Sequence, residues 1–296
     1  SIKTSGSQTF GDAVTLGANA TLESSAGTLT FSSTLAAGGK DLTLSADEID
    51  FAGTVSGGGA LTLQPATDAT SIGIAGAAGT LELTAVELGK LADGFSSITI
   101  GRATGTGTTT VNAVSFSDPV TIRQPGVAGK VQLDGAITGT GNALVTLSAG
   151  SGGVALNAGV DTSAANGNII LTGDVTLGAA TVTLAAGSGD VTFNNKVDGD
   201  KNLVVNTSGN TIFSAAVGGT TPLTSVTTDA LGTTKINGGS IKTSGSQTFG
   251  DAVTLGAATT LTSTGGNLTF NSTVVGAFNL TLDTAGTANF NGVVGS

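Results

Sequence analysis

The sequence contains no cysteine, histidine, methionine, tryptophan or tyrosine, and only 4 prolines among 296 residues. Without cysteine there is no disulfide framework and no thiolate metal site. Without histidine the commonest general base and transition-metal ligand is missing. We therefore expect no enzymatic activity, no catalytic residues and no cofactor.

Charged residues are also scarce, at 10% of the chain, and acids outnumber bases by 20 to 10. A net charge of −10 repels nucleic acid and anionic lipid, so we expect no nucleic-acid partner. No apolar run approaches the roughly 18–20 residues of a membrane span. The sequence has no initiating methionine and no signal-like segment, and we interpret it as part of a longer chain.

What the chain has instead is a recurring motif, in which a phenylalanine is followed four residues later by valine or leucine. Successive motifs stand 21 and 20 residues apart at Phe10, Phe31 and Phe51, and again at Phe249, Phe270 and Phe290. The motif phenylalanines are Phe10, Phe31, Phe51, Phe116, Phe193, Phe213, Phe249, Phe270 and Phe290, while Phe95 and Phe278 fall outside the pattern.

A fixed period of this length is the signature of a stacked repeat architecture. A unit of about 20 residues has room for two or three short strands but not for a crossover helix, so each strand pairs with its copy one coil away. The sequence therefore predicts an all-β fold, a parallel β-helix of about 20 residues per coil, right-handed because parallel crossovers strongly favour that hand. We expect the nine motif phenylalanines to stack in one column in its core.

Alternation of apolar residues with threonine, as in Leu42–Leu44 and Leu61–Leu63, predicts strands with apolar side chains inward and threonine outward. At the corners Asp134-Gly135, Asn237-Gly238 and Asn291-Gly292, we expect glycine to supply positive φ. The asparagines after the motif phenylalanine are expected to form a hydrogen-bonded ladder. They are Asn194, Asn271 and Asn291.

A second, longer period is superimposed on the coil. Ser1–Ala18 recurs residue for residue as Ser240–Ala257, an offset of 239. We interpret 1–239 as one β-solenoid super-repeat and 240–296 as the start of the next, continuous with the first. No proline-rich or charged linker separates them, so we expect further repeats or identical chains to continue the stack end to end.

One segment interrupts the repeat of short strands. Thr84–Gly94 has a Thr-x-x-Glu capping box, apolar residues in helical spacing and a terminal glycine. It predicts a helix of about two turns near 85–92, with Phe95 closing over it. The helix would serve as a lateral cap on a corner or as a docking knob for a partner.

The densest group of candidate site residues is Asp47, Glu48 and Asp50, with Lys40 and Asp41 nearby. Carboxylates with lysine or arginine on one face would indicate a polysaccharide-degrading β-helix enzyme; a solvated corner is the alternative. Arg102 and Arg123 stand about one coil apart and would line up as an anion clamp.

Two further kinds of site are considered from the sequence. The first is a calcium site, because Ca²⁺ takes oxygen ligands alone. The segments Gly187–Val191 and Asp198–Asp200 share only a few residues with calcium-binding turns, so we assign no metal ligands. Outward threonine pairs invite an ice-binding interpretation, which needs such pairs on every successive coil. The pairs are Thr28/Thr30, Thr181/Thr183 and Thr260/Thr262.

Four segments together resemble the giant repeat proteins of bacterial surfaces, grouped with filamentous haemagglutinin-like adhesins: 11–18, 88–102, 114–122 and 217–228. The resemblance implies an extracellular or surface-anchored right-handed β-helix with adhesive or scaffolding work, and offers no catalytic residues. We expect a structural segment, a rigid stalk or filament, on the bacterial cell surface. The alternatives are a carbohydrate-binding adhesin that contacts surface polysaccharide, a polysaccharide-degrading enzyme and an ice-binding solenoid.

Overall fold

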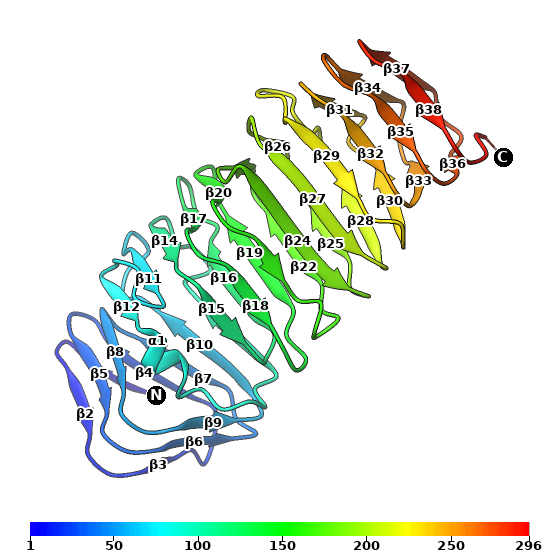
Figure 1. Cartoon of the computed structure of the whole chain (residues 1–296). Coiled ribbons are helices and arrows are strands. Elements are labelled where there is room, and N and C mark those ends of the chain that lie inside the picture. Colours follow the sequence, from blue (N-terminus) through cyan, green and yellow to red (C-terminus); the bar gives the residue numbers. More distant parts are fainter. Residues whose placement is uncertain (296) are drawn as a thin grey trace. The chain divides into compact units, whose positions relative to one another are not determined.

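The computed structural model describes residues 1–295 (Figure 1). The strands are two to seven residues long and are joined by tight corners. Nearly all of them pair in parallel with a strand about one coil away, as where Leu61 stands between Leu42 and Ile98. The exception is Leu81–Leu83, which pairs with Ile72–Ile74, where Ile72 stands opposite Leu81. The chain is therefore an all-β parallel β-solenoid with coils of about 21 residues and about 14 turns, as the phenylalanine period predicted.

The chain forms two compact units, Ser1–Gly152 and Gly153–Ser296. This boundary differs from the super-repeat boundary after Gly239, which is a feature of the sequence and stays a prediction. In the first unit one sheet has the strand order β1 (Ile2–Thr4), β4 (Ala20–Ser24), β7 (Leu42–Ser45), β10 (Ala60–Gln64), β13 (Ser97–Ile100), β16 (Val120–Gln124), β19 (Val145–Ala149). Two further sheets have the orders β12 (Leu81–Leu83), β11 (Ile72–Ile74), β14 (Thr108–Val111), β17 (Lys130–Leu133) and β15 (Val114–Phe116), β18 (Ile137–Gly139). Two three-stranded sheets have the orders β2 (Gln8–Phe10), β5 (Thr28–Phe31), β8 (Glu48–Phe51) and β3 (Val14–Thr15), β6 (Leu35–Gly38), β9 (Val55–Gly57).

The second unit is built in the same way. One sheet has the strand order β22 (Ile169–Thr172), β25 (Val191–Phe193), β28 (Asn210–Phe213), β30 (Thr233–Ile236), β33 (Ala252–Leu255), β36 (Val274–Val275). Another has the order β21 (Val160–Asp161), β24 (Thr181–Gly187), β27 (Asn202–Thr207), β29 (Ser225–Thr228), β32 (Gln247–Phe249), β35 (Leu268–Phe270), β38 (Ala288–Phe290). Two shorter runs have the orders β20 (Gly153–Leu156), β23 (Val175–Leu177), β26 (Val197–Asp198) and β31 (Ser240–Thr243), β34 (Thr259–Ser263), β37 (Leu280–Thr284).

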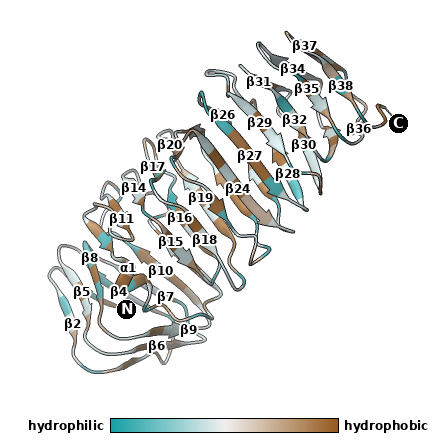
Figure 2. Ribbon diagram, in the orientation of Figure 1, coloured by the Kyte–Doolittle hydropathy of each residue, from teal (hydrophilic) through white to brown (hydrophobic). Residues whose placement is uncertain are grey.

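Alternation along each strand separates core from surface, as the change of colour along single strands in Figure 2 shows. In β10, Leu61 and Leu63 are fully buried, whereas Thr62 between them is half-buried and faces outward. Burying one leucine side chain contributes about 1.5–3 kcal/mol. Because every coil adds such residues in register, the core runs through each unit as ladders of like side chains.

The motif phenylalanines do stack, but the prediction of a single column is wrong. Among residues 1–295 they form separate stacks on different sheets, with ring centroids 4.8–5.7 Å apart: Phe10, Phe31 and Phe51 on β2, β5 and β8; Phe193 and Phe213 on β25 and β28; and Phe249, Phe270 and Phe290 on β32, β35 and β38. Phe116 stands opposite Gly139 instead. Coils of unequal length move the motif from one sheet to another.

The corner glycines are required for a different reason from the one predicted. Gly135, Gly238 and Gly292 do not have positive φ. A Cβ on Gly135 would lie 2.0 Å from the Ala113 nitrogen, and one on Gly238 would lie 2.1 Å from the Ala215 carbonyl carbon. These corners are glycine because the backbone of the preceding coil passes too close for any side chain.

The asparagine ladder forms in part. Asn291 donates from Nδ2 to Oδ1 of Asn271 at 2.9 Å, one coil away. Asn194 instead donates to the Thr172 hydroxyl at 3.0 Å. The polar corner contacts therefore link adjacent coils even where the partner is not a second asparagine.

One coil is much longer than the rest and carries the helix. The register offset from Leu42 to Leu61 is 19 residues, but from Leu61 to Ile98 it is 37. The extra residues form β11, β12 and the helix α1 (Ala85–Leu88), whose predicted capping box is present. In residues 1–295 no helix is long and apolar enough to cross a bilayer.

The helix is shorter than predicted for 85–92, and Phe95 packs against the coil before it. Helical hydrogen bonding stops at Gly89, so α1 is a single turn. Phe95 is buried, with 1% of its surface exposed. Its ring atom Cε1 lies 2.6 Å from the position that a Cβ on Gly57 would take. Phe95 therefore anchors the long coil by packing over a glycine of the coil before it.

Candidate functional site

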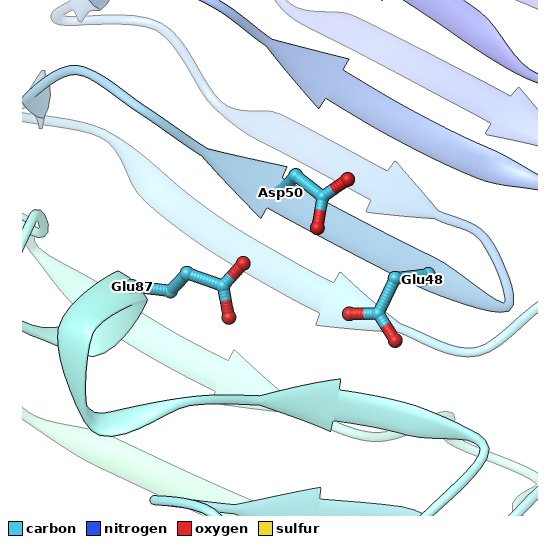
Figure 3. A group of neighbouring side chains, drawn as sticks. All are labelled: Glu48, Asp50 and Glu87. Carbon is cyan, nitrogen blue, oxygen red and sulfur yellow. The ribbon is translucent and has the colours of Figure 1, made fainter.

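Three carboxylates converge beside α1. Glu48 and Asp50 of β8 and Glu87 of α1 each place one oxygen so that all three lie within 4.8 Å of one another (Figure 3). Glu48 and Asp50 share a face because they stand two apart on one strand. Glu87 is held there by the capping box, in which its Oε2 accepts from the N–H and the hydroxyl of Thr84, both at 2.8 Å.

Burial changes the protonation of Glu48, one of the three acids. Burial, with smaller contributions from the nearby Glu87 and Asp50 charges, raises the pKa of Glu48 to about 7. Backbone N–H groups of Glu82 and Ile49, at 3.4 Å each, oppose the shift. Near neutral pH Glu48 therefore carries a proton part of the time.

Carboxylate oxygens at this spacing suit a hard cation such as Ca²⁺, which takes 6–8 oxygen ligands. The cluster supplies three residues toward that number. A carboxyl with a pKa near 7 could also exchange a proton with a substrate. Neither property by itself identifies a ligand.

Sequence reasoning found two of these three acids. Asp47 precedes β8 and lies outside the cluster, and Asp41 instead accepts from the Ala60 N–H (2.9 Å) and the Asn19 amide (3.1 Å). Glu87 was missed as a partner of Glu48 because 39 residues separate the two in the sequence. The capping box was the available signal, since it fixes the direction of the Glu87 side chain.

The two arginines do not line up. Ile100 pairs with Ile122, so Arg123 lies against Gly101, whose carbonyl accepts from its Nε at 3.1 Å. Arg102 instead pairs with Asp68 at 2.5 Å and donates to the Pro65 and Ala66 carbonyls. A one-residue difference in register places consecutive side chains on opposite faces, which is why the predicted anion clamp does not form.

The two segments considered for calcium, Gly187–Val191 and Asp198–Asp200, instead form hydrogen bonds to the next coil. Asp190 accepts from the backbone N–H (2.7 Å) and the side-chain amide (2.8 Å) of Asn210. Asp198 accepts from the N–H groups of Thr220 and Thr221 at 2.8 and 3.0 Å. Each carboxylate organises a corner one coil later.

The threonine pairs do not repeat from coil to coil. Thr28 and Thr30 stand beside Glu48 and Asp50. Thr181 and Thr183 stand beside Asn202 and Val204, and Thr260 and Thr262 beside Thr281 and Asp283. The regular array needed for an ice-binding face is therefore interrupted at the neighbouring coil in each case.

A groove of about 430 Å³ runs along another side of α1. It is bordered by Ala85 and Leu88 of the helix and by Val114, Ser115 and Thr138 of β15 and β18. Val86 of α1 is 71% exposed. The groove is small-sided and has no aromatic platform for a sugar ring, so its occupant is not specified by its lining.

Beside the groove lies a smaller cavity of about 170 Å³ that contains Asp118. This aspartate is buried, 2% exposed, and accepts from the Gly94 N–H at 2.9 Å. Burial raises its pKa, and Asp93 nearby adds to the effect. Asp118 anchors the end of the helical insertion.

Comparison with known proteins identifies no family for this chain. A scan against family models, a search of curated proteins and a search of solved structures each found no match. Evidence for the function of this chain therefore comes from its own residues.

Proposed function

We propose that this chain is one span of a very long bacterial extracellular or cell-surface protein, in which 239-residue super-repeats build a rigid β-solenoid stalk or filament. Each super-repeat would contribute about 11 coils at about 4.8 Å per coil, or roughly 55 Å. The protein would work by length and stiffness, because main-chain pairing runs along the axis of each coil stack.

The observation that carries the proposal is the way the second copy begins. Val217 pairs with Ile241, and Leu223 with Thr243, on either side of the Gly239–Ser240 junction. β29 and β30, before the junction, pair in parallel with β32 and β33 after it. A chain made of separate domains would interrupt this pairing, whereas a repeating stalk needs it to continue.

The two copies also fold alike in detail. Gln8 donates from Nε2 to the Thr4 hydroxyl (3.0 Å) and to a carbonyl of the next coil (2.7 Å). Gln247, 239 residues later, donates to the Thr243 hydroxyl (3.2 Å) and to the corresponding carbonyl (2.9 Å). The first coils of the two copies thus make the same local contacts, which supports tandem use of the super-repeat.

Electron microscopy of chains with one, two and three tandem super-repeats tests the proposal. An unbranched rod whose length grows by roughly 55 Å per super-repeat supports it. A particle that becomes compact as repeats are added contradicts it. Immunogold labelling of the producing cells would check the surface location.

A second candidate is a carbohydrate-binding adhesin, for which the groove of about 430 Å³ beside α1 offers space. Its small side chains leave space where a sugar residue or an extended polymer would contact β15 and β18. Glycan-array binding by the wild-type chain, lost in Ala136→Trp because the indole would fill the groove, supports this function. Equal binding by both chains would contradict it.

The proposal includes no catalysis. Arg102 is engaged by Asp68 and Arg123 by Gly101, so neither completes the carboxylate cluster beside α1. A polysaccharide-degrading β-helix would need such a basic partner on the same face. Reducing-sugar release from acidic polysaccharides would overturn this part of the proposal.

A further inference from the structure

The first coil presents one uncovered side, which we name the amino-terminal face: β1, β2 and β3, residues 2–16. Within residues 1–295 each of these strands is the first of its sheet, with a partner on one side only. Ile2 is 48% exposed, and Phe10 is only half-buried despite its stack on Phe31. An apolar, unpaired strand edge of this kind recruits further strands unless something covers it.

The identical sequence is covered in the second copy. Ile241 and Phe249, the counterparts of Ile2 and Phe10, are fully buried. The cover is the coil Val217–Gly239, named the covering coil here, which pairs with β31, β32 and β33. The structure therefore contains the same surface twice, once open and once occupied.

A buried polar contact joins the covering coil to the occupied copy. Asp251 is 1% exposed and accepts from the hydroxyls of Thr228 and Thr234, both at 2.8 Å. Its counterpart Asp12 is exposed. The carboxylate thus matches a pair of hydroxyls that belongs to the covering coil.

Glycine positions show the same contrast. Gly11 has nothing within 4 Å of the place where a Cβ would stand, whereas a Cβ on its counterpart Gly250 would lie 2.4 Å from the Asp229 carbonyl oxygen. Gly6 and Gly17 likewise face open space, and their counterparts Gly245 and Gly256 lie against Thr224 and Asn237. The open face therefore carries the close-approach glycines that only an adjoining coil requires.

We infer that the amino-terminal face is the binding surface for the covering coil of another super-repeat, which would seat on β1, β2 and β3 as Val217–Gly239 seats on β31, β32 and β33. Asp12 would accept from the two threonine hydroxyls. The contact is head to tail, so it propagates rather than closes. This inference rests on the proposed stalk and names the residues through which its super-repeats join.

One consequence distinguishes this surface from a generally sticky edge. In the 296-residue chain the covering coil is already occupied by residues 240–257, so free copies of this chain are not expected to join through it. Only a super-repeat that ends at Gly239 offers the coil.

The test is to fuse a second Ser1–Gly239 directly before Ser1 of the full chain and compare it with the unextended chain. In the occupied copy the Gly250 N–H donates to the Thr228 carbonyl at 3.2 Å. We expect the Gly11 N–H in the extended chain to gain the same bond and to exchange with solvent on the order of 100-fold more slowly. Unchanged exchange at Gly11 would overturn the inference.

Asp12→Ala provides a second readout. It should be silent in the unextended chain but should speed exchange at Gly11 in the extended chain, as Asp251→Ala should at Gly250 in both. An Asp12→Ala effect that is the same with and without the extension would contradict the inference. If the long fusion does not fold, fusing residues 172–239 instead presents the same coil.

This outcome is separable from the stalk proposal. Protection at Gly11 with a protein that is not found in rods on cells would sustain the joining surface and reject the stalk. Rods without protection at Gly11 would do the reverse.

Discussion

Asp251 offers the sharpest test of how adjacent coils are held together, because the sequence contains its own control. Asp251→Ala removes the acceptor of two hydroxyls that are themselves buried, Thr228 at 2% and Thr234 at 0% exposure. A buried polar group left without a partner costs about 1–3 kcal/mol. Asp12→Ala changes the same residue in the same local sequence on an open surface.

The net magnitude is smaller than the sum for two hydroxyls. Burial raises the pKa of Asp251, so its charged form is disfavoured in the folded protein, and removing it returns part of the loss. We expect Asp251→Ala to lower the free energy of unfolding by about 2 kcal/mol. Asp12→Ala should change it by less than about 0.5 kcal/mol.

The assay is urea unfolding combined with hydrogen exchange, because coils of a solenoid open with their neighbours and the loss should be local. Exchange should accelerate in β29, β30 and β33 and not in the first unit. Asp251→Asn keeps an oxygen acceptor for both threonines and should remain within about 0.5 kcal/mol of wild type. Equal effects of Asp251→Ala and Asp12→Ala would refute the reasoning.

The pH dependence of this group has a definite sign. Because the folded state of Asp251 holds its proton to higher pH than the unfolded state, its contribution to stability is greatest below the unfolded pKa of 3.8 and falls as pH rises through the folded pKa. Asp251→Asn should remove that part of the slope.

Three further predictions concern other parts of the chain. Glu48→Gln should flatten the loss of stability that wild type shows as pH rises from 4.5 to about 7, measured as the urea midpoint; an unchanged pH profile would contradict the raised pKa. Phe270→Ala removes the middle ring of a stack with centroid distances of 5.3 and 4.8 Å, and it should lower the free energy of unfolding, measured by calorimetry, by about 3–5 kcal/mol. Phe278 is 49% exposed, so Phe278→Ala should change that free energy little. Gly250→Ala should destabilise the chain, because its Cβ would meet backbone at 2.4 Å, while Gly11→Ala should be neutral or slightly stabilising; similar thermal midpoints would argue against close coil approach.

The alternation of leucine and threonine and the phenylalanine period were sufficient to predict the parallel β-solenoid. Each coil repeats the same short pattern, and a side chain two residues along a strand must return to the same face. The predicted capping box at Thr84 and Glu87 also formed, because it depends on residues three apart. These features are local, and local sequence determines them.

Features that depend on the sum of coil lengths were not predictable. The stacks at Phe193/Phe213 and at Phe249/Phe270 lie on different sheets although their motif is the same. One residue of register separates Arg102 from the partner that spacing suggested for it. The register offset between successive strands decides such positions. It varies along the chain, as from 19 residues between Leu42 and Leu61 to 37 between Leu61 and Ile98, and the motif itself does not encode it.

The carboxylate cluster and the amino-terminal face show what tertiary structure alone decided. Glu87 meets Glu48 because a long coil folds back beside β8, which no spacing rule anticipates. Asp12 and Asp251 have the same neighbours in sequence, yet one is exposed and the other buried. In a solenoid the adjacent coil determines whether a side chain is buried. Two identical segments therefore differ in burial and hydrogen bonding when the coils beside them differ.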